Sequence, residues 1–161
     1  MRVAVSEPLS LPPLPFWPPL ASAVGNAVVE NHCDSPVYLW SVGSSVGERQ
    51  TIDPGANYSE ELRHDDVSGG IALKITTTEN GLYDGSPQTD FAYALSGTEV
   101  FYDLSDVFGD PFSGKTLVVN PSVDTCNNIC WSGGIAATAA SQTESCTSDS
   151  DVTLTLCADS C

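Results

Sequence analysis

Apolar and polar residues alternate in short runs along most of the chain, and turn-forming residues separate these runs. The runs are rich in Val, Ile, Tyr, Phe and Thr, and the segments between them carry Gly, Pro, Asn and Asp. Such runs, recurring about every ten residues, are typical of β-strands joined by tight turns. The strands that this pattern predicts are 27–31, 37–42, 48–52, 58–62, 71–76, 90–95, 99–103, 116–120 and 152–157.

The same pattern predicts the fold class. No segment keeps a helical period, although the alanine-rich residues 133–144 are compatible with a turn or two of helix. We therefore expect an all-β protein, a single-domain antiparallel β-sandwich over residues 24–161. Because side chains alternate along a strand, one face should carry Phe91, Tyr93 and Leu95 toward the core. The opposite face then carries Asp90 and Ala92.

The first 23 residues differ in composition from the rest. They have an early arginine, an apolar middle and the small residues Ala21, Ser22 and Ala23, as at a signal-peptide cleavage site. They also hold six of the chain's eleven prolines and Glu7, and dense proline makes a poor helical signal core. We expect residues 1–23 to be a signal peptide or an atypical leader, outside the fold.

The charge is strongly acidic. Residues 24–161 carry 4 Lys and Arg against 20 Asp and Glu, a net charge of 4 − 20 = −16. Such a surface repels phosphate backbones and anionic lipids, so we expect neither a nucleic acid nor a membrane as partner. Nothing in the chain indicates a cofactor or a stable oligomer, and we expect a monomer.

Six cysteines in a small acidic chain indicate an oxidising compartment and disulfide bonds. The alternative is a zinc site, but Cys126–Cys130 and Cys157–Cys161 each enclose three residues, where zinc pairs usually enclose two. We expect no metal. Six cysteines allow fifteen connectivities. In a sandwich the first and last strands often lie together, and a bridge from Cys33 to Cys157 would close a loop of about 124 residues, stabilising the fold by roughly 4–5 kcal/mol.

Six segments, in this order, carry a family resemblance. They are VVENHCDSPVYLW, QTIDPGANYS, GGIALKI, TDFAYAL, FYDLSDVFGDPF and DVTLTLC. Together they resemble the thaumatin-like proteins, and more closely their small fungal branch, the yeast-phase-specific antigens of Blastomyces and relatives. The resemblance implies a thaumatin-like β-sandwich that a fungus secretes and that acts outside the cell or in its wall.

The resemblance also implies how the cysteines pair. Larger family members bond the cysteine of the first strand to the cysteine that closes the last strand. The pairs implied are Cys33–Cys157, Cys126–Cys146 and, with the two cysteines that remain, Cys130–Cys161. Separately, Asn57-Tyr58-Ser59 is an N-glycosylation sequon in a predicted turn.

Plant-type family members have an acidic cleft that is linked to β-1,3-glucan binding and sometimes to slow hydrolysis. By resemblance, the arginine of that cleft falls on Lys74, its glutamate on Asp90 and one aspartate on Asp103. A second aspartate falls on Phe108, which breaks the pattern. The candidates to replace it are Asp106 and Asp110. The last aspartate of the cleft belongs to a second domain with no counterpart here.

Sugar rings pack on flat apolar faces, so aromatic residues near these positions are candidate ligand contacts. We expect an exposed platform made by Tyr102, Phe108 and Phe112. The resulting hypothesis is a non-catalytic binder of cell-wall β-glucan. One alternative is a weak endo-β-1,3-glucanase that uses Asp90 and Asp103, which requires two carboxyl groups about 5–5.5 or 6.5–9.5 Å apart. The other is a surface antigen or interaction protein with no carbohydrate ligand.

Overall fold

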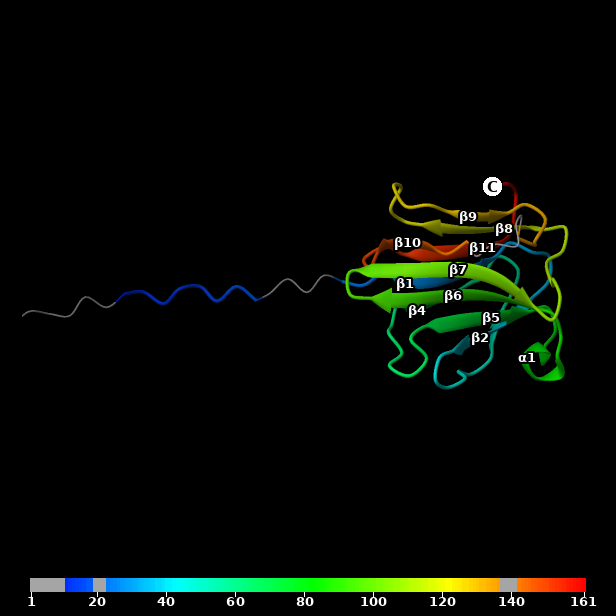
Figure 1. The fold of residues 1–161 in the computed structure, drawn as a ribbon, viewed down its shortest axis with the longest axis horizontal. Helices are drawn as coiled ribbons and strands as arrows, with labels where there is room; N and C mark the ends of the chain where they lie inside the picture. Colours follow the sequence, from blue (N-terminus) through cyan, green and yellow to red (C-terminus); the bar gives the residue numbers. More distant parts are fainter. Residues whose placement is uncertain (1–10, 19–22, 137–141) are drawn as a thin grey trace, which may run out of the picture.

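A computed structural model describes residues 11–18, 23–136 and 142–161. Its strands are β1 (Asn26–Asn31), β2 (Val37–Val42), β3 (Gln50–Ile52), β4 (Asn57–Glu61), β5 (Ile71–Thr76), β6 (Gln88–Ser96), β7 (Glu99–Val107), β8 (Thr116–Pro121), β9 (Ile129–Trp131), β10 (Glu144–Thr147) and β11 (Val152–Ala158). A single helical turn, α1 (Gly81–Asp84), precedes β6. The strands form two sheets, of order β4-β1-β11-β8-β9 and β10-β7-β6-β5-β2-β3, which pack into a sandwich (Figure 1).

The expected β-sandwich is confirmed, with three differences in detail. All nine predicted strands are present, β2 and β5 with the predicted bounds and the others with shifted ends, but β9, β10 and α1 were not predicted. The pairing is antiparallel except between β1 and β11, which run parallel. In the alanine-rich stretch, residues 133–136 and 142–144 are not helical, and residues 137–141 lie outside the described part of the chain. The leader assigned to residues 1–23 stays a prediction: residues 11–18 are exposed and have no regular secondary structure, and most of the others are not described.

The predicted alternation along β6 is confirmed. Phe91 and Tyr93 are buried in the core between the sheets, at 0% and 2% exposure. Leu95 is half-buried and packs against the same core. Ala92 and Asp90 both point to the outer face of the six-stranded sheet. Neighbouring side chains cover Asp90 on that face. Burying one large apolar side chain contributes about 1.5–3 kcal/mol, which strongly fixes this register.

The two ends of the folded domain are tied together by backbone pairing and by a disulfide. Strands β1 and β11 lie side by side, and Cys33, just after β1, is bonded to Cys157 in β11 with Cα atoms 5.1 Å apart. The other disulfides are Cys126–Cys146 and Cys130–Cys161. These are the pairs that the resemblance implied. Because all six cysteines are oxidised, the zinc alternative is wrong.

A carboxylate on an edge strand joins the two sheets. Glu60 of β4 accepts hydrogen bonds from the hydroxyl of Tyr58, at 2.7 Å, and from that of Tyr93 on β6 of the other sheet, at 2.5 Å. Burial raises the pKa of both tyrosines above its usual value, and the bonded Glu60 carboxylate raises it further. Both hydroxyls therefore remain protonated donors, and the second bond fastens the sheets together.

A second carboxylate holds two surface loops in place. Asp65 accepts hydrogen bonds from the backbone and hydroxyl of Ser44, both at 2.9 Å, and from the backbone amides of Val67 and Ser68 at 3.0 and 2.7 Å. These donors, the Ser68 amide first, hold the pKa of Asp65 below its usual value. The turn after β2 is thus fixed to the loop before β5.

Candidate functional site

The outer face of the six-stranded sheet brings the predicted polar residues together. Strand pairing places Lys74 of β5 opposite Asp90 of β6, and Ala92 of β6 opposite Asp103 of β7. Since residues two apart on a strand share a face, Asp90 and Asp103 are diagonal neighbours on this surface. The sequence-predicted trio of Lys74, Asp90 and Asp103 therefore lies in two adjacent rows of one face.

Asp90 is held as a hydrogen-bond acceptor. Its Oδ2 lies 2.9 Å from Nζ of Lys74, and the two side chains are only 11% and 24% exposed. Its Oδ1 accepts a hydrogen bond of 3.0 Å from the carboxamide of Gln88, two residues earlier on the same face. Charge-assisted hydrogen bonds of this kind are stronger than neutral ones. Both carboxylate oxygens of Asp90 are therefore engaged and oriented.

Asp103 borders a shallow hollow of about 370 Å³, which we call the trough. Its floor is formed by Ala72, Ala92 and Ala94, and its walls include Val42 and Phe101. The small floor residues sit next to one another on β5 and β6, so the larger side chains around them leave a depression. The trough offers an apolar surface with one carboxylate at its rim.

The other contacts of Asp103 are local. Its Oδ1 accepts from the backbone amide of Leu104 at 2.8 Å, and its Oδ2 lies 3.4 Å from the hydroxyl of Thr143. Thr143 belongs to the segment that leads into β10, and it also lines the trough. Among the described residues, Thr143 is the one that this segment contributes to the edge of the trough, beside Asp103.

The predicted aromatic platform is wrong for two of its three members. Tyr102 and Phe112 are 1% and 3% exposed and belong to the core, whereas Phe108, at the end of β7, is 72% exposed. Tyr102 is buried because its neighbour Asp103 faces outward and side chains alternate. Three aromatic residues, Tyr93, Phe101 and Tyr102, line the trough, and of these only Phe101, 37% exposed and not among the three predicted contacts, presents its side chain to solvent.

Asp106 does not replace the family's second aspartate on this face. It pairs with Thr89 on the same side of β7 as the buried Leu104, and accepts a 2.6 Å hydrogen bond from the Thr89 hydroxyl. Burial raises the pKa of Asp106, while this hydrogen bond lowers it and the charges of Asp110 and Asp90 raise it further. Its carboxyl group therefore points away from the trough, and Asp110 does not line the trough either.

Two further features lie outside the trough. Trp40, opposite Lys74 on β2, is buried beneath Tyr83 of α1 in an edge-to-face contact with ring centroids 6.2 Å apart. A larger hollow of about 580 Å³ lies beside the Cys33–Cys157 disulfide, and of the predicted ligand contacts it includes only Phe112.

Within the described residues, no group of three or more His, Cys, Asp or Glu is arranged to hold a metal ion, and no helix is long and apolar enough to cross a membrane.

Comparison with known proteins adds two relatives from fungi. The antigenic thaumatin-like protein of Arthroderma benhamiae is 34% identical over 144 residues, covering 84% of this chain and 72% of the relative. The secreted thaumatin-like protein calA of Emericella nidulans is 31% identical over 155 residues, covering 89% of this chain and 87% of the relative. The name of this second relative, with the three disulfides found here, supports an extracellular location.

Two solved structures show the same fold. The protein elicitor MoHrip2 from Magnaporthe oryzae superimposes with a TM-score of 0.69 at 24% identity, covering 83% of this chain and 99% of that one. The thaumatin-like xylanase inhibitor TLXI gives a TM-score of 0.57 at 13% identity, covering 82% of this chain and 99% of that one. The fold is therefore the thaumatin-like β-sandwich.

The family itself is identified by a match that covers most of the chain. Residues 14–158 match the family described as Bys1, the Blastomyces yeast-phase-specific protein. This range includes both sheets of the sandwich and the whole outer face on which Lys74, Asp90 and Asp103 lie. The chain therefore belongs to the Blastomyces yeast-phase-specific protein family, a fungal family of thaumatin-like proteins.

Proposed function

We propose that the protein is a non-catalytic binder of cell-wall β-glucan and that the glucan lies along the trough. The observation that carries this proposal is the trough itself, an alanine floor with Asp103 at its rim and the Lys74–Asp90 pair in the next row. A pyranose ring presents C–H groups on its faces and hydroxyl groups around its edge. An apolar surface bordered by a few fixed polar groups complements both features.

The spacing of the two carboxylates does not by itself separate binding from catalysis. Diagonal neighbours on adjacent strands lie about 7–8 Å apart at the backbone, so their carboxyl groups can reach the separation of about 6.5–9.5 Å that inverting glycosidases use. Hydrolysis also needs one carboxyl group that donates a proton to the leaving oxygen. Asp90 already accepts hydrogen bonds at both oxygens, from Lys74 and Gln88, which suits an acceptor of sugar hydroxyls rather than a proton donor.

Water access argues in the same direction. The trough is a shallow depression in the outer face of a sheet, and within the described residues only Thr143 reaches it from the segment before β10. Electrostatic stabilisation of an oxocarbenium-like transition state is strongest where water is excluded. The glucanase alternative therefore has less support than binding, and an interaction protein without a sugar ligand is the remaining alternative.

Co-sedimentation with insoluble β-1,3-glucan tests this proposal. The double variant Asp90→Asn/Asp103→Asn keeps the shape of both side chains but removes two charged acceptors. Since a hydrogen bond to a charged group contributes about 1.5–3 kcal/mol, retention should fall at least about tenfold. The control is Asp53→Asn/Asp149→Asn, which makes the same charge change at two exposed carboxylates outside the trough.

Release of reducing sugar is measured in the same samples. We expect retention without turnover for the unmodified protein. Steady hydrolysis that disappears in either single Asn variant would favour the glucanase alternative. Equal retention of both double variants, or no retention of the unmodified protein on any wall polysaccharide, would reject the trough as a glucan site.

A further inference from the structure

A polar groove separate from the trough lies at the open edge of the sandwich, where β9 ends one sheet and β10 ends the other. It consists of two adjoining hollows of about 500 and 360 Å³ that share Asn128. Each volume is in the range of small-ligand pockets, about 300–1,000 Å³. We call this the edge groove, and its polar lining residues are Asn120, Asp124, Asn127, Asn128, Gln142 and Glu144.

We propose that the edge groove is a second binding site, for a neutral oligosaccharide. Four of its six polar side chains are carboxamides, each of which both donates and accepts hydrogen bonds. Hydroxyl groups of a sugar also do both, so a row of carboxamides can pair with vicinal hydroxyls. Asp124 and Glu144 add acceptors, and neither Lys nor Arg lines the groove, so a uronic acid or a phosphate would be repelled.

Buried aromatic residues fix the orientation of this surface. The indole Nε1 of Trp131, a residue only 2% exposed, donates to Oε1 of Gln142 at 2.9 Å. That bond assigns the amide oxygen of Gln142 to the protein and, within the described residues, leaves its NH₂ group for a ligand. The hydroxyl of the equally buried Tyr102 donates to the backbone carbonyl of Asn127.

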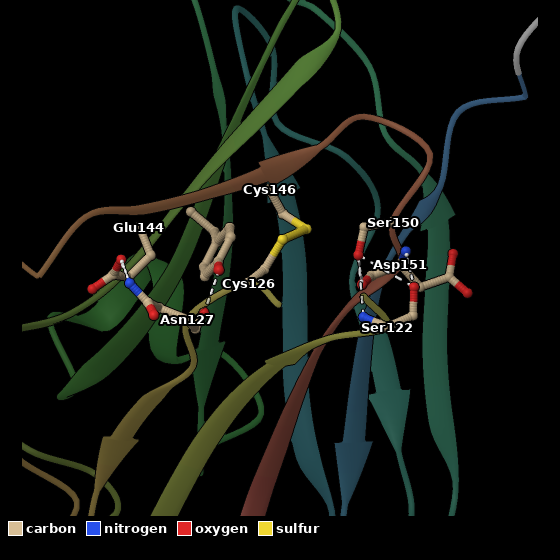
Figure 2. Close-up of a disulfide and its surroundings, with 8 residues drawn as sticks. Ser122, Cys126, Asn127, Glu144, Cys146, Ser150 and Asp151 are labelled. Atoms are coloured by element: carbon tan, nitrogen blue, oxygen red, sulfur yellow. Dashed lines mark hydrogen bonds between the residues drawn. A yellow bond between two sulfur atoms is a disulfide. The ribbon is translucent and has the colours of Figure 1, made fainter. Parts of the chain in front are cut away.

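A disulfide and a side-chain hydrogen bond reinforce the same wall. Figure 2 shows Asn127 donating from Nδ2 to Oε2 of Glu144, at 3.0 Å, beside the Cys126–Cys146 disulfide that joins the loop before β9 to β10. Among the residues that the structure describes, this leaves Oδ1 of Asn127 and Oε1 of Glu144 as acceptors. A site whose groups are already held in position loses less conformational entropy when it binds.

The remaining carboxamides are available to a ligand. Asn120 and Asn128 are exposed, and within the residues that the structure describes neither side chain makes a hydrogen bond to another protein group. The hollows are lined mainly by polar groups, so the apolar side chains of a peptide would find little surface to bury. An oligosaccharide, whose binding groups are hydroxyls, fits this lining better.

The test is an NMR titration of the ¹⁵N-labelled full chain, which reads the side-chain NH₂ signals of Asn127, Asn128 and Gln142. The probes are laminarihexaose, cellohexaose and xylohexaose at millimolar concentration, with hexagalacturonate as the anionic comparison. We expect these three NH₂ signals to shift with at least one neutral hexasaccharide and not with hexagalacturonate.

The matched variant is Asn128→Asp/Gln142→Glu, which keeps the shape of both side chains and the acceptor for Trp131 but removes two NH₂ donors. It should weaken binding at least about tenfold, whereas Gln50→Glu on edge strand β3 should not.

The proposal is overturned if the three NH₂ signals stay unshifted with every neutral probe, or if the double variant binds with unchanged affinity. Shifts confined to the backbone amides of Ala72 and Ala92 would overturn the edge groove and leave the trough as the only sugar site, so the two proposals can fail separately.

Discussion

Removing the Cys33–Cys157 disulfide should destabilise the protein more than removing either of the other two. The perturbation is the double variant Cys33→Ala/Cys157→Ala, which leaves no unpaired thiol to form a new bond. This disulfide joins the end of β1 to β11, so it closes nearly the whole domain into one loop. A cross-link stabilises a protein largely by restricting its unfolded chain, and the restriction grows with the length of the closed loop.

The three closed loops give the expected order of effects. Cys33–Cys157 has a sequence separation of 124, Cys130–Cys161 of 31 and Cys126–Cys146 of 20. The chain-entropy relation then gives losses of about 4.9, 3.7 and 3.3 kcal/mol at 25 °C. The largest of these approaches the whole stability of many domains, about 5–15 kcal/mol.

Urea unfolding of the three double variants, followed by tryptophan fluorescence, measures the losses. Trp40 and Trp131 are both 2% exposed, so unfolding should change their emission clearly. We expect the Cys33/Cys157 variant to lose at least about 1 kcal/mol more than the other two. If it is the most stable of the three, loop closure does not explain what this disulfide contributes.

Three further changes test local parts of the structure. Tyr93→Phe removes the inter-sheet hydrogen bond to Glu60 and should lower the free energy of unfolding by about 1.5–3 kcal/mol; an unchanged urea midpoint would contradict this. Asp65 has a lowered pKa in the folded state, so its stabilisation is complete above its usual pKa near 4 and is lost as the pH falls toward the folded-state value. The difference in melting temperature between Asp65→Asn and the unmodified protein should therefore narrow below about pH 4, and a constant difference would contradict the assignment. Gly134 has φ of 75°, and a Cβ there would lie 1.9 Å from the carbonyl oxygen of Phe112, so Gly134→Ala should lower the melting temperature measurably, whereas Gly133→Ala, with open space around it, should not.

The strands and the register of β6 could be predicted because alternation is a property of each strand alone. The burial of Phe91 and Tyr93 follows from that period. Strands β9 and β10 have three and four residues, too few to show a period, and they form because β8 and β7 offer them partners. The parallel pairing of β1 with β11 joins opposite ends of the chain and has no local signal.

Part of the candidate site could also be predicted. The family resemblance grouped Lys74, Asp90 and Asp103 in one cleft, and alternation put Asp90 on the outward face of its strand. The same alternation, applied from Asp103 to Tyr102, would have predicted that Tyr102 is buried. Phe112 lies in a loop between β7 and β8, where no period applies, and its burial depends on packing that only the folded chain shows. The carboxamides of the edge groove come together through β9 and β10, the two strands that the sequence did not predict.

A crystal structure of the protein with laminarihexaose would show where the glucan binds. We expect a pyranose ring to lie over Ala92, with hydroxyl groups within hydrogen-bonding distance of Asp103 and Asp90 and with the glycosidic bonds intact. A ligand found only in the edge groove or beside the Cys33–Cys157 disulfide, or no ligand at millimolar concentration, would contradict the assignment of the outer face of the six-stranded sheet as the glucan-binding site.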